Sequence, residues 1–305
     1  MPCYHPITGY RAQERNEKTG KYSVVFNPKQ GYIDMPITVP CGQCIGCRLE
    51  RSRQWAIRCM HEASLHEKNC FITLTYDDDH LPEDRSLNVK EFQDFMKRFR
   101  KKVGVPLRYY HCGEYGDKFG RPHYHACIFG YDFPDRKYLK KLPSGHAIFK
   151  SEILSKLWKK GYASVGDVTF DSAAYVARYI TKKVTGKDAE DHYWFCDEET
   201  GESWPISPEY TTMSRRPGIA ADWFKKYISD VYPSDTVIVK EKAVRPPKFY
   251  DGMFEAEFPE EFEKVKRRRK NKLLHVMAEK PEEFTPRRIA DKEKFQEIKY
   301  KSRGF

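Results

Sequence analysis

The stretch VPLRYYHCGEYGDKFGRPHYHACIFG, residues 105–130, contains two strand-like runs joined by a glycine-rich turn. Aromatic and aliphatic runs on either side of such a turn are typical of an antiparallel hairpin. Successive side chains of a strand point to opposite faces, so His123 and His125 would share one face and Tyr124 would point to the other. Two imidazoles on one face can bind a single ion, or they can be partly buried histidines held by hydrogen bonds.

Glu114 is a candidate third ligand on the neighbouring strand. If the turn spans roughly residues 115–122, Glu114 lies near His123 across the hairpin. Two imidazoles and one carboxylate suit Mg²⁺ or Mn²⁺, with coordination positions left for water and phosphate oxygens. The alternatives are that Glu114 is a surface residue beside a turn, and that His111, on the opposite face of the strand, is the ligand.

The segments around the hairpin predict an α+β fold. We expect strands at 70–76 and 162–170, and helices at 48–66, 87–104, 151–161 and 171–184. The last of these helices could be capped by Asp171. The order β-α-β-β-α-β-α is typical of a ferredoxin-like or RRM-like βαββαβ core, in which helices pack on an antiparallel sheet. The hairpin strands then lie in the interior of the sheet.

The helix expected at 171–184 carries two different stripes of side chains. The aliphatic stripe, which we expect to face the sheet, comprises Ala173, Val176, Ala177, Ile180 and Val184. The opposite stripe comprises Tyr175, Arg178, Tyr179 and Lys182. Tyrosines that share a stripe with cations are candidate nucleophiles, because positive charge favours the phenolate and binds phosphate. A solvent-exposed helix face is the alternative interpretation.

The composition limits the kind of partner. The 305-residue chain has a formal net charge of +11, with 39% hydrophobic and 32% charged residues. This balance favours a polyanion, either nucleic acid or an anionic membrane surface. No apolar run approaches the roughly 18 residues that a membrane-spanning helix needs, and the N-terminus lacks the layout of a secretory signal. We therefore expect a protein of a reducing cytoplasm that binds nucleic acid.

Cysteines cluster near the start of the chain. Cys41, Cys44 and Cys47 form a C-x₂-C-x₂-C pattern, and Cys3 or His5 could complete a set of four ligands. Four thiolates would make a closed structural zinc site that holds a polar and otherwise irregular segment. Free thiols and an iron–sulfur cluster are the alternatives. The remaining cysteines, which we expect to be small buried residues, are Cys59, Cys70, Cys112, Cys127 and Cys196.

The expected organisation has three parts. These are a cysteine-containing N-terminal segment (1–47), a domain with the hairpin and the tyrosine helix (48–232), and a basic, charged C-terminal extension (233–305) that is helical or partly disordered. The run KVKRRRKNK, residues 264–272, would add salt-sensitive affinity for nucleic acid. Arg215 and Arg216 precede a proline in MSRRPGI and could contact phosphate or lie in a solvated turn.

These motifs together resemble those of the HUH endonucleases, a family of rolling-circle replication initiators and relaxases. FITLTYDD (71–78) is similar to the first motif of the family, RPHYHACIFG (121–130) to its metal motif, and YVARYITKK (175–183) to its nucleophile motif in the two-tyrosine form. The GEYG and GRPHYH strings, the cysteine-rich start and MSRRPGI are especially similar to replication initiators of microviruses, single-stranded DNA phages, and of their gokushovirus branch.

The resemblance implies an endonuclease and strand transferase that starts rolling-circle replication. It makes Tyr175 and Tyr179 alternating nucleophiles, and it makes His123, His125 and Glu114 ligands of Mg²⁺ or Mn²⁺. The assisting cation is Lys182 or Arg178, because each stands three residues after one of the tyrosines. Expected DNA contacts are Arg178, Lys183, Arg215 and Arg216. The implied partner is single-stranded origin DNA in the cytoplasm of a bacterial host.

Other functions fit the same residues. A hydrolytic nuclease would keep the metal and not use the tyrosines. A non-catalytic module would stack single-stranded bases on sheet aromatics such as Tyr109 and Tyr124. A relaxase or transposase shares the chemistry, but the gokushovirus-like segments argue against it. The chain has no phosphate-binding Gly-Lys-Ser/Thr loop, so a host helicase and the host replication machinery are expected to separate the strands.

Overall fold

The computed structural model describes residues 3–17, 20, 22–116, 120–142, 145–184, 188–197 and 200–301, with the side chains of 179–182, 188 and 301 left undescribed. The chain divides into two units, residues 1–51 with 266–305, and residues 52–265. The divisions fall within helices α1 (Ile45–Ala63) and α9 (Pro259–Glu279).

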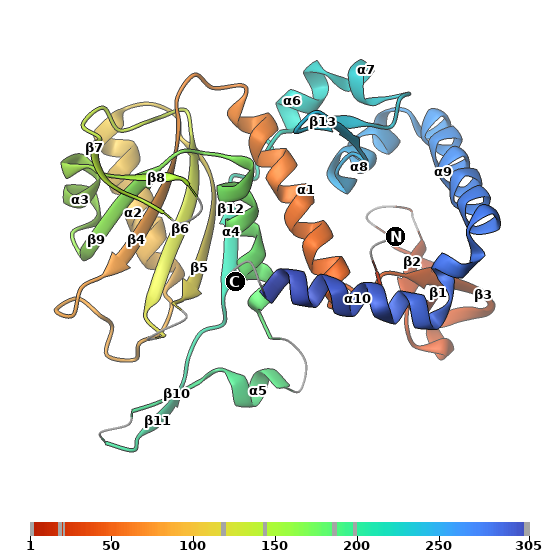
Figure 1. Ribbon diagram of the computed structural model, residues 1–305, viewed down its shortest axis with the longest axis horizontal. Helices are drawn as coiled ribbons and strands as arrows, with labels where there is room; N and C mark the ends of the chain where they lie inside the picture. Colours follow the sequence, from red (N-terminus) through yellow and green to blue (C-terminus); the bar gives the residue numbers. More distant parts are fainter. Residues whose placement is uncertain are drawn as a thin grey trace. The chain divides into compact units, whose positions relative to one another are not determined.

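The larger unit contains, in its described part, a seven-stranded antiparallel sheet of order β12-β5-β6-β4-β9-β8-β7 (Figure 1). Its strands are β4 (Asn69–Tyr76), β5 (Arg108–Tyr115), β6 (Pro122–Phe129), β7 (Lys137–Lys141), β8 (Ala147–Lys150), β9 (Gly161–Gly166) and β12 (Tyr210–Met213). β5 and β6 pair from Arg108↔Phe129 to Tyr115↔Pro122. The hairpin, its interior position and the α+β class are therefore confirmed, whereas β7 and β8 were not expected.

One face of this sheet is covered by α2 (Val89–Val103) and α3 (Glu152–Trp158) (Figure 1). The buried side of α2 consists of Phe92, Phe95, Met96 and Phe99, each at most 1% exposed. They pack with Ile72, Leu74 and Tyr124 of the strands. The i, i+3, i+4, i+7 spacing of these residues produces a helix whose single apolar face is buried against the sheet.

The other face is covered by α4 (Phe170–Lys182) and by the part of α1 after residue 51. Trp55 of α1 stacks on Tyr110 of β5, with ring centroids 4.5 Å apart. The expectation that Asp171 caps α4 was wrong. The Thr169 side chain accepts the backbone N–H of Ser172, and Ser172 reciprocates, so the hydroxyl pair satisfies the first free N–H groups of the helix.

Shorter elements complete the larger unit. They are α5 (Asp188–His192), β10 (Trp194–Cys196), β11 (Ser203–Pro205), α6 (Ala221–Lys226), α7 (Ile228–Val231), β13 (Val237–Val239), β14 (Lys242–Val244) and α8 (Lys248–Glu257). Side chains from α6, α7 and α8 join the same apolar cluster as α1 and α4. This cluster fixes the helices on the sheet face that carries the histidine pair.

The smaller unit corrects the expectation of an irregular N-terminal segment. Its described residues form a sheet of order β2-β1-β3, from β1 (Ile7–Arg15), β2 (Tyr22–Val25) and β3 (Gly31–Val39), with a 3₁₀ turn η1 (Pro28–Gln30). It also contains residues 266–279 of α9, the 3₁₀ turn η2 (Pro281–Phe284) and α10 (Pro286–Lys301). The strands were missed because they are largely exposed on both faces and so lack apolar alternation.

The C-terminal residues belong to both units. Residues up to 265, with α8, group with the larger unit, and the described residues from 266 onward group with the smaller one. The three functional parts that the sequence suggests stay a prediction. No helix in the described part of the chain is both long enough and apolar enough to cross a membrane.

Candidate active site

Strand β6 presents the two histidines on the sheet face that α4 covers. Tyr124, between them, is fully buried on the opposite face among the α2 side chains, which confirms the predicted alternation. In the neighbouring strands Glu114 of β5 lies opposite His123, and Thr73 of β4 lies opposite His125. Strand pairing therefore brings residues from three segments to one place on the sheet.

Glu114 and His125 contact each other at this site. The Nε2 atom of His125 lies 2.5 Å from Oε1 of Glu114, and the two residues are 5% and 4% exposed. The other ring nitrogen of His125, Nδ1, lies 2.9 Å from Oγ1 of Thr73. Buried polar groups of this kind persist in proteins only when each has a partner.

His123 has a comparable arrangement. Its Nδ1 atom lies 2.5 Å from the carbonyl oxygen of Arg121, so the ring donates there and keeps its lone pair on Nε2. Burial lowers the pKa of His123 and so favours the neutral imidazole. The rings of His123 and His125 are nearly parallel, with centroids 6.3 Å apart.

These side chains are of the types that ligate divalent ions. In metal sites a ligating histidine is neutral, and its second nitrogen donates to a carbonyl or hydroxyl oxygen that fixes the ring. Both histidines have Nδ1 held in this way, and Glu114 adds a carboxylate oxygen. Among the described residues, the group whose potential ligand atoms all lie within 4.8 Å of one another is the four-cysteine cluster of the smaller unit, and the set of Glu114, His123 and His125 is not such a group.

Tyr175 of α4 reaches the same place. Its phenol oxygen donates to Oε1 of Glu114 at 3.4 Å, and its ring stands edge-on to His125 with centroids 5.1 Å apart. The aliphatic residues Ala173, Val176 and Ala177 are buried as expected, and Tyr175 of the opposite stripe also contacts sheet residues. Ala174 is also buried, and Ser52 donates to its carbonyl oxygen at 2.9 Å, so α4 has neighbours on more than one side.

The structure describes the side chains of only some of the other expected site residues. The side chains of Tyr179 and Lys182 lie outside the described residues. Arg178 is half-buried and its Nε atom donates to the carbonyl oxygen of Ala174 at 3.4 Å. Lys183 follows the end of α4 and is half-buried.

His111 does not belong to this site. It is fully buried on the other face of the sheet, where its ring stacks on Phe92 with centroids 3.4 Å apart. Its Nδ1 atom pairs with Oγ1 of Thr212 at 3.0 Å, and burial lowers its pKa well below the usual value. Glu114 is therefore the better ligand of the two.

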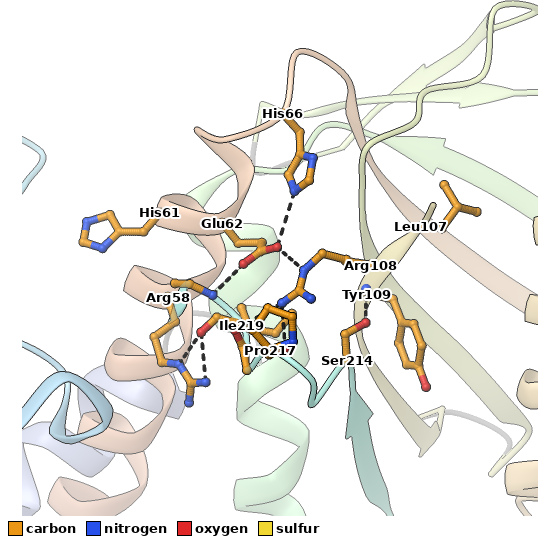
Figure 2. A network of polar contacts seen from close by, with 12 residues as sticks. Arg58, His61, Glu62, His66, Leu107, Arg108, Tyr109, Ser214, Pro217 and Ile219 are labelled. Carbon is orange, nitrogen blue, oxygen red and sulfur yellow. Dashed lines mark hydrogen bonds and ion pairs between the residues drawn. The ribbon is translucent and has the colours of Figure 1, made fainter. Parts of the chain in front are cut away.

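A buried carboxylate anchors the turn that carries the arginine pair (Figure 2). Glu62 of α1, 2% exposed, pairs with Nε of Arg108 and accepts the backbone N–H of Ala220 at 2.5 Å. Arg108 also donates to the carbonyl oxygen of Pro217 at 3.0 Å. The residues that make these contacts lie far apart in the sequence, and no local pattern predicts them.

Arg58 adds a second attachment to the same turn (Figure 2). Its guanidinium donates twice to the carbonyl oxygen of Ile219, at 3.1 and 3.0 Å. Arg215 and Arg216 remain exposed on the turn. The structure thus places two guanidinium groups at the surface of a turn that hydrogen bonds hold in place.

The cysteines divide into two groups. The sulfur atoms of Cys3, Cys41, Cys44 and Cys47 lie together in the smaller unit. Cys59, Cys70, Cys112 and Cys127 are fully buried, as expected. The same expectation for Cys196 was wrong, since the residue is exposed. It lies on β10, a short strand that pairs only with β11 in the described part of the chain.

Thr73 and Phe71 are site residues that the sequence reasoning missed. Thr73 holds His125, and the ring of Phe71 contacts the rings of both His125 and Tyr175. Alternation along β4 places Phe71 and Thr73 on one face, so the signal was present in FITLTY. Only the β4–β6 register shows that this face is the one with the histidines.

Comparisons with known proteins place the chain in a family. The family model described as replication-associated protein ORF2/G2P matches residues 69–184, from β4 to the end of α4. The chain is 34% identical over 273 residues to replication-associated protein VP4 of Bdellovibrio phage phiMH2K, covering 86% of this chain and 80% of the relative. No solved structure matches.

Two further relatives come from other viruses. Replication-associated protein ORF2 of Spiroplasma virus 4 is 32% identical over 280 residues, with 86% of this chain and 83% of the relative covered. Replication-associated protein ORF4 of Chlamydia phage 1 is 30% identical over 246 residues, covering 76% and 58%. Since these similarities span most of the chain, it belongs to the family of replication-associated proteins of microviruses.

Proposed function

We propose that this protein initiates rolling-circle replication by nicking one strand of single-stranded origin DNA through tyrosine attack. Membership of the microvirus replication-associated family supports a role in replication. The observation that carries the proposed chemistry is the approach of the Tyr175 phenol to Glu114, which in turn contacts His125. A nucleophile, a carboxylate and an imidazole are thus within reach of one phosphate.

The fold proposed for this chemistry is the ferredoxin-like core of the HUH endonucleases. The hairpin and its neighbours have the strand order β9-β4-β6-β5, and they are connected in the order β-α-β-β-α-β apart from the inserted β7 and β8. In chain order this corresponds to the fourth, first, third and second strands. The arrangement leaves the histidine strand in the middle of the sheet, beneath α4.

In the proposed step the phenol oxygen of Tyr175 forms a bond to phosphorus, and the bond from phosphorus to the 3′ oxygen breaks. The phenol proton passes to water, the neighbouring cation stabilises the phenolate, and the departing 3′ oxygen takes a proton from water. The products are a 5′-phosphotyrosine and a free 3′-hydroxyl. The phosphodiester energy is conserved, so the strand can be rejoined, with Tyr179 one turn later as the second nucleophile.

Glu114, His123 and His125 would hold Mg²⁺ or Mn²⁺ in this proposal. When bound, such an ion neutralises charge that develops on the phosphate oxygens. Thr73 and the Arg121 carbonyl fix the two imidazole rings. Lys182 or Arg178 is the proposed cation beside the phenolate.

The proposed partners follow from the charge of the chain and the reaction. Arg178, Lys183, Arg215 and Arg216 would contact phosphates. The reaction would take place in the bacterial host cytoplasm, with strand separation supplied by a host helicase.

The test is covalent capture of labelled single-stranded origin DNA with Mn²⁺ present. Nicked DNA should migrate with the protein after denaturation, and peptide mapping should place the label on Tyr175 or Tyr179. Tyr175→Phe together with Tyr179→Phe should abolish the adduct. Tyr138→Phe, at a tyrosine that is 65% exposed on β7, is the matched control and should not change it.

Each alternative function gives a different result in the same assay. Cleavage without any protein-bound DNA, unchanged in the double tyrosine variant, would identify a hydrolytic nuclease. DNA binding that needs neither Mn²⁺ nor His125 and never yields cut product would identify a binding module. Either result contradicts the proposed tyrosine chemistry.

A further inference from the structure

We propose that Cys3, Cys41, Cys44 and Cys47 bind one structural zinc ion in the smaller unit. All four sulfur atoms lie within 4.8 Å of one another, and those of Cys3 and Cys41 are 3.7 Å apart. In a tetrahedral site with zinc–sulfur bonds of about 2.3 Å, neighbouring sulfurs are about 3.8 Å apart. The cluster therefore has the dimensions of a single four-coordinate ion.

Backbone groups around the cluster favour thiolates. The N–H of Tyr4 points to the sulfur of Cys44 at 3.4 Å, and the N–H of Cys41 points to that of Cys3 at 3.3 Å. The N–H of Cys44 points to the sulfur of Cys41, also at 3.3 Å. Outer hydrogen bonds of this kind orient metal ligands and stabilise their negative charge.

The start of α1 contributes to the same environment. Cys44 directly precedes its first residue, Ile45, and Cys47 lies in its first turn. The positive end of the helix dipole stabilises anionic ligands there. The two-residue spacings between Cys41, Cys44 and Cys47 allow a short loop and one helical turn to direct three sulfurs at one ion.

The smaller unit also needs a stabilising element other than a core. Among its described residues Ala12 is the sole apolar side chain that is buried. Exposed instead are large apolar side chains of the sheet and of the residue after β2: Ile7, Val24, Phe26, Tyr32, Ile33, Met35 and Ile37. Small folds with so little buried surface depend on cross-links or metals, and a zinc ion joining Cys3 to residues 41–47 would tie the start of β1 to α1.

The geometry argues against an iron–sulfur cluster and against a disulfide. A [4Fe–4S] cluster binds each cysteine through a different iron atom, which requires the sulfurs to surround a cube and not a single ion. A disulfide requires sulfurs about 2.05 Å apart, whereas the sulfurs of Cys3 and Cys41 are 3.7 Å apart, a separation compatible with two ligands of one ion. A closed set of four sulfurs leaves no position for substrate, so the role is structural.

The test is the metal content of the full-length protein, purified from cells grown with added zinc, by elemental mass spectrometry. We expect about one zinc per chain. The double variant Cys41→Ser with Cys44→Ser should lose it. Cys196→Ser, at an exposed cysteine of the larger unit, should retain it. His125→Ala should also retain it, which separates this site from the histidines on the large sheet.

A cysteine variant could lose zinc simply because it does not fold, so a second measurement uses the wild-type protein. X-ray absorption at the zinc edge should show four sulfur neighbours at about 2.3 Å. His5→Ala should leave this spectrum unchanged, because Nε2 of His5 pairs with Glu293 at 2.7 Å in the structure. Nitrogen or oxygen in the first shell, iron in place of zinc, or chains that contain no metal would overturn the proposal.

Discussion

Single side chains hold the imidazoles of the candidate site in place. Thr73 contributes only a hydroxyl, yet this hydroxyl engages Nδ1 of His125 at 2.9 Å and leaves Nε2 to face Glu114. A residue that acts through another in this way would position the proposed ligand His125 without contacting the proposed ion. Loss of the Thr73 hydroxyl should therefore reduce metal affinity more than it reduces folding stability.

Thr73→Val should weaken Mn²⁺ binding about 10- to 100-fold, because valine keeps the shape of threonine but removes the partner of His125 Nδ1. Calorimetric titration of Mn²⁺ would measure the change. Thr212→Val is the matched control, since Thr212 makes the same contact to His111 on the other face of the sheet. Equal Mn²⁺ affinity in the wild type and Thr73→Val would contradict the positioning role.

The buried histidine His61 makes folding stability depend on pH. His61 of α1 stacks on Trp223 with ring centroids 3.5 Å apart, and its Nδ1 lies 2.7 Å from the phenol oxygen of Tyr250. Burial lowers the pKa of His61 to about 4, whereas the value in an unfolded chain is about 6.5. Between these values the unfolded state binds more protons, so stability falls as pH drops through this window.

His61→Phe should remove this part of the pH dependence. Between pH 7 and pH 5 the wild type should lose about 1–2 kcal/mol more unfolding free energy than the variant does. Urea denaturation at both pH values would measure it. His192→Phe, at an exposed histidine of α5, should keep the wild-type response. If His61→Phe lost as much unfolding free energy as the wild type, groups other than His61 would be responsible for the pH dependence.

At the scale of elements, α2 and α3 end in the same left-handed backbone conformation with different residues. Gly104 after α2 has φ 68°, and Lys159 after α3 has φ 62°. Glycine adopts this conformation without strain, whereas a residue with a Cβ atom does not. The sequence signalled the end of α2 through its glycine, but it gave no such signal for α3.

Lys159→Gly should therefore stabilise the protein by about 0.5–1 kcal/mol, because the lysine is exposed and the change relieves backbone strain. Gly104→Ala should destabilise it by about 1 kcal/mol. A Cβ atom at Gly104 would meet no neighbour within 4 Å, so the loss would come from the backbone alone. Urea denaturation would measure both changes, and effects of the same sign in the two variants would contradict this explanation.

At the scale of the molecule, the net charge of +11 should make DNA binding strongly salt-dependent. The densest basic run lies on α9, and it includes Arg267, Arg268, Arg269 and Lys270. Lysines also line α2, but α2 covers the sheet face opposite to the histidines. Substitutions in these two groups therefore test whether DNA affinity depends on the position of the charges or only on the net charge of the chain.

Changing all four α9 residues to glutamine should reduce the slope of log affinity against log salt by about 2–3, if each contacts a phosphate of single-stranded DNA. Fluorescence anisotropy at several salt concentrations would measure the slope. The control changes Lys90, Lys97, Lys101 and Lys102 of α2 to glutamine and should alter it much less. Equal slopes in both variants would show that net charge, and not position, governs binding.

The sequence by itself determined the elements around the hairpin and the face on which the histidines lie. Alternation in residues 122–129 and the 3.6-residue spacing in α2 are local signals, because a buried face repeats with the period of its own backbone. The cysteine spacing likewise indicated three of the cluster members. By contrast, the exposed β1–β3 sheet has no such period and was missed.

Only the tertiary structure decided which residues meet. The contacts of His125 with Thr73 and Glu114, the approach of Tyr175, and the Glu62–Arg108 pair all join segments that are distant in the sequence. They depend on strand register and on how α1 and α4 pack against the sheet. Neither property leaves a local pattern, because it arises from the mutual fit of surfaces and not from the periodicity of one segment.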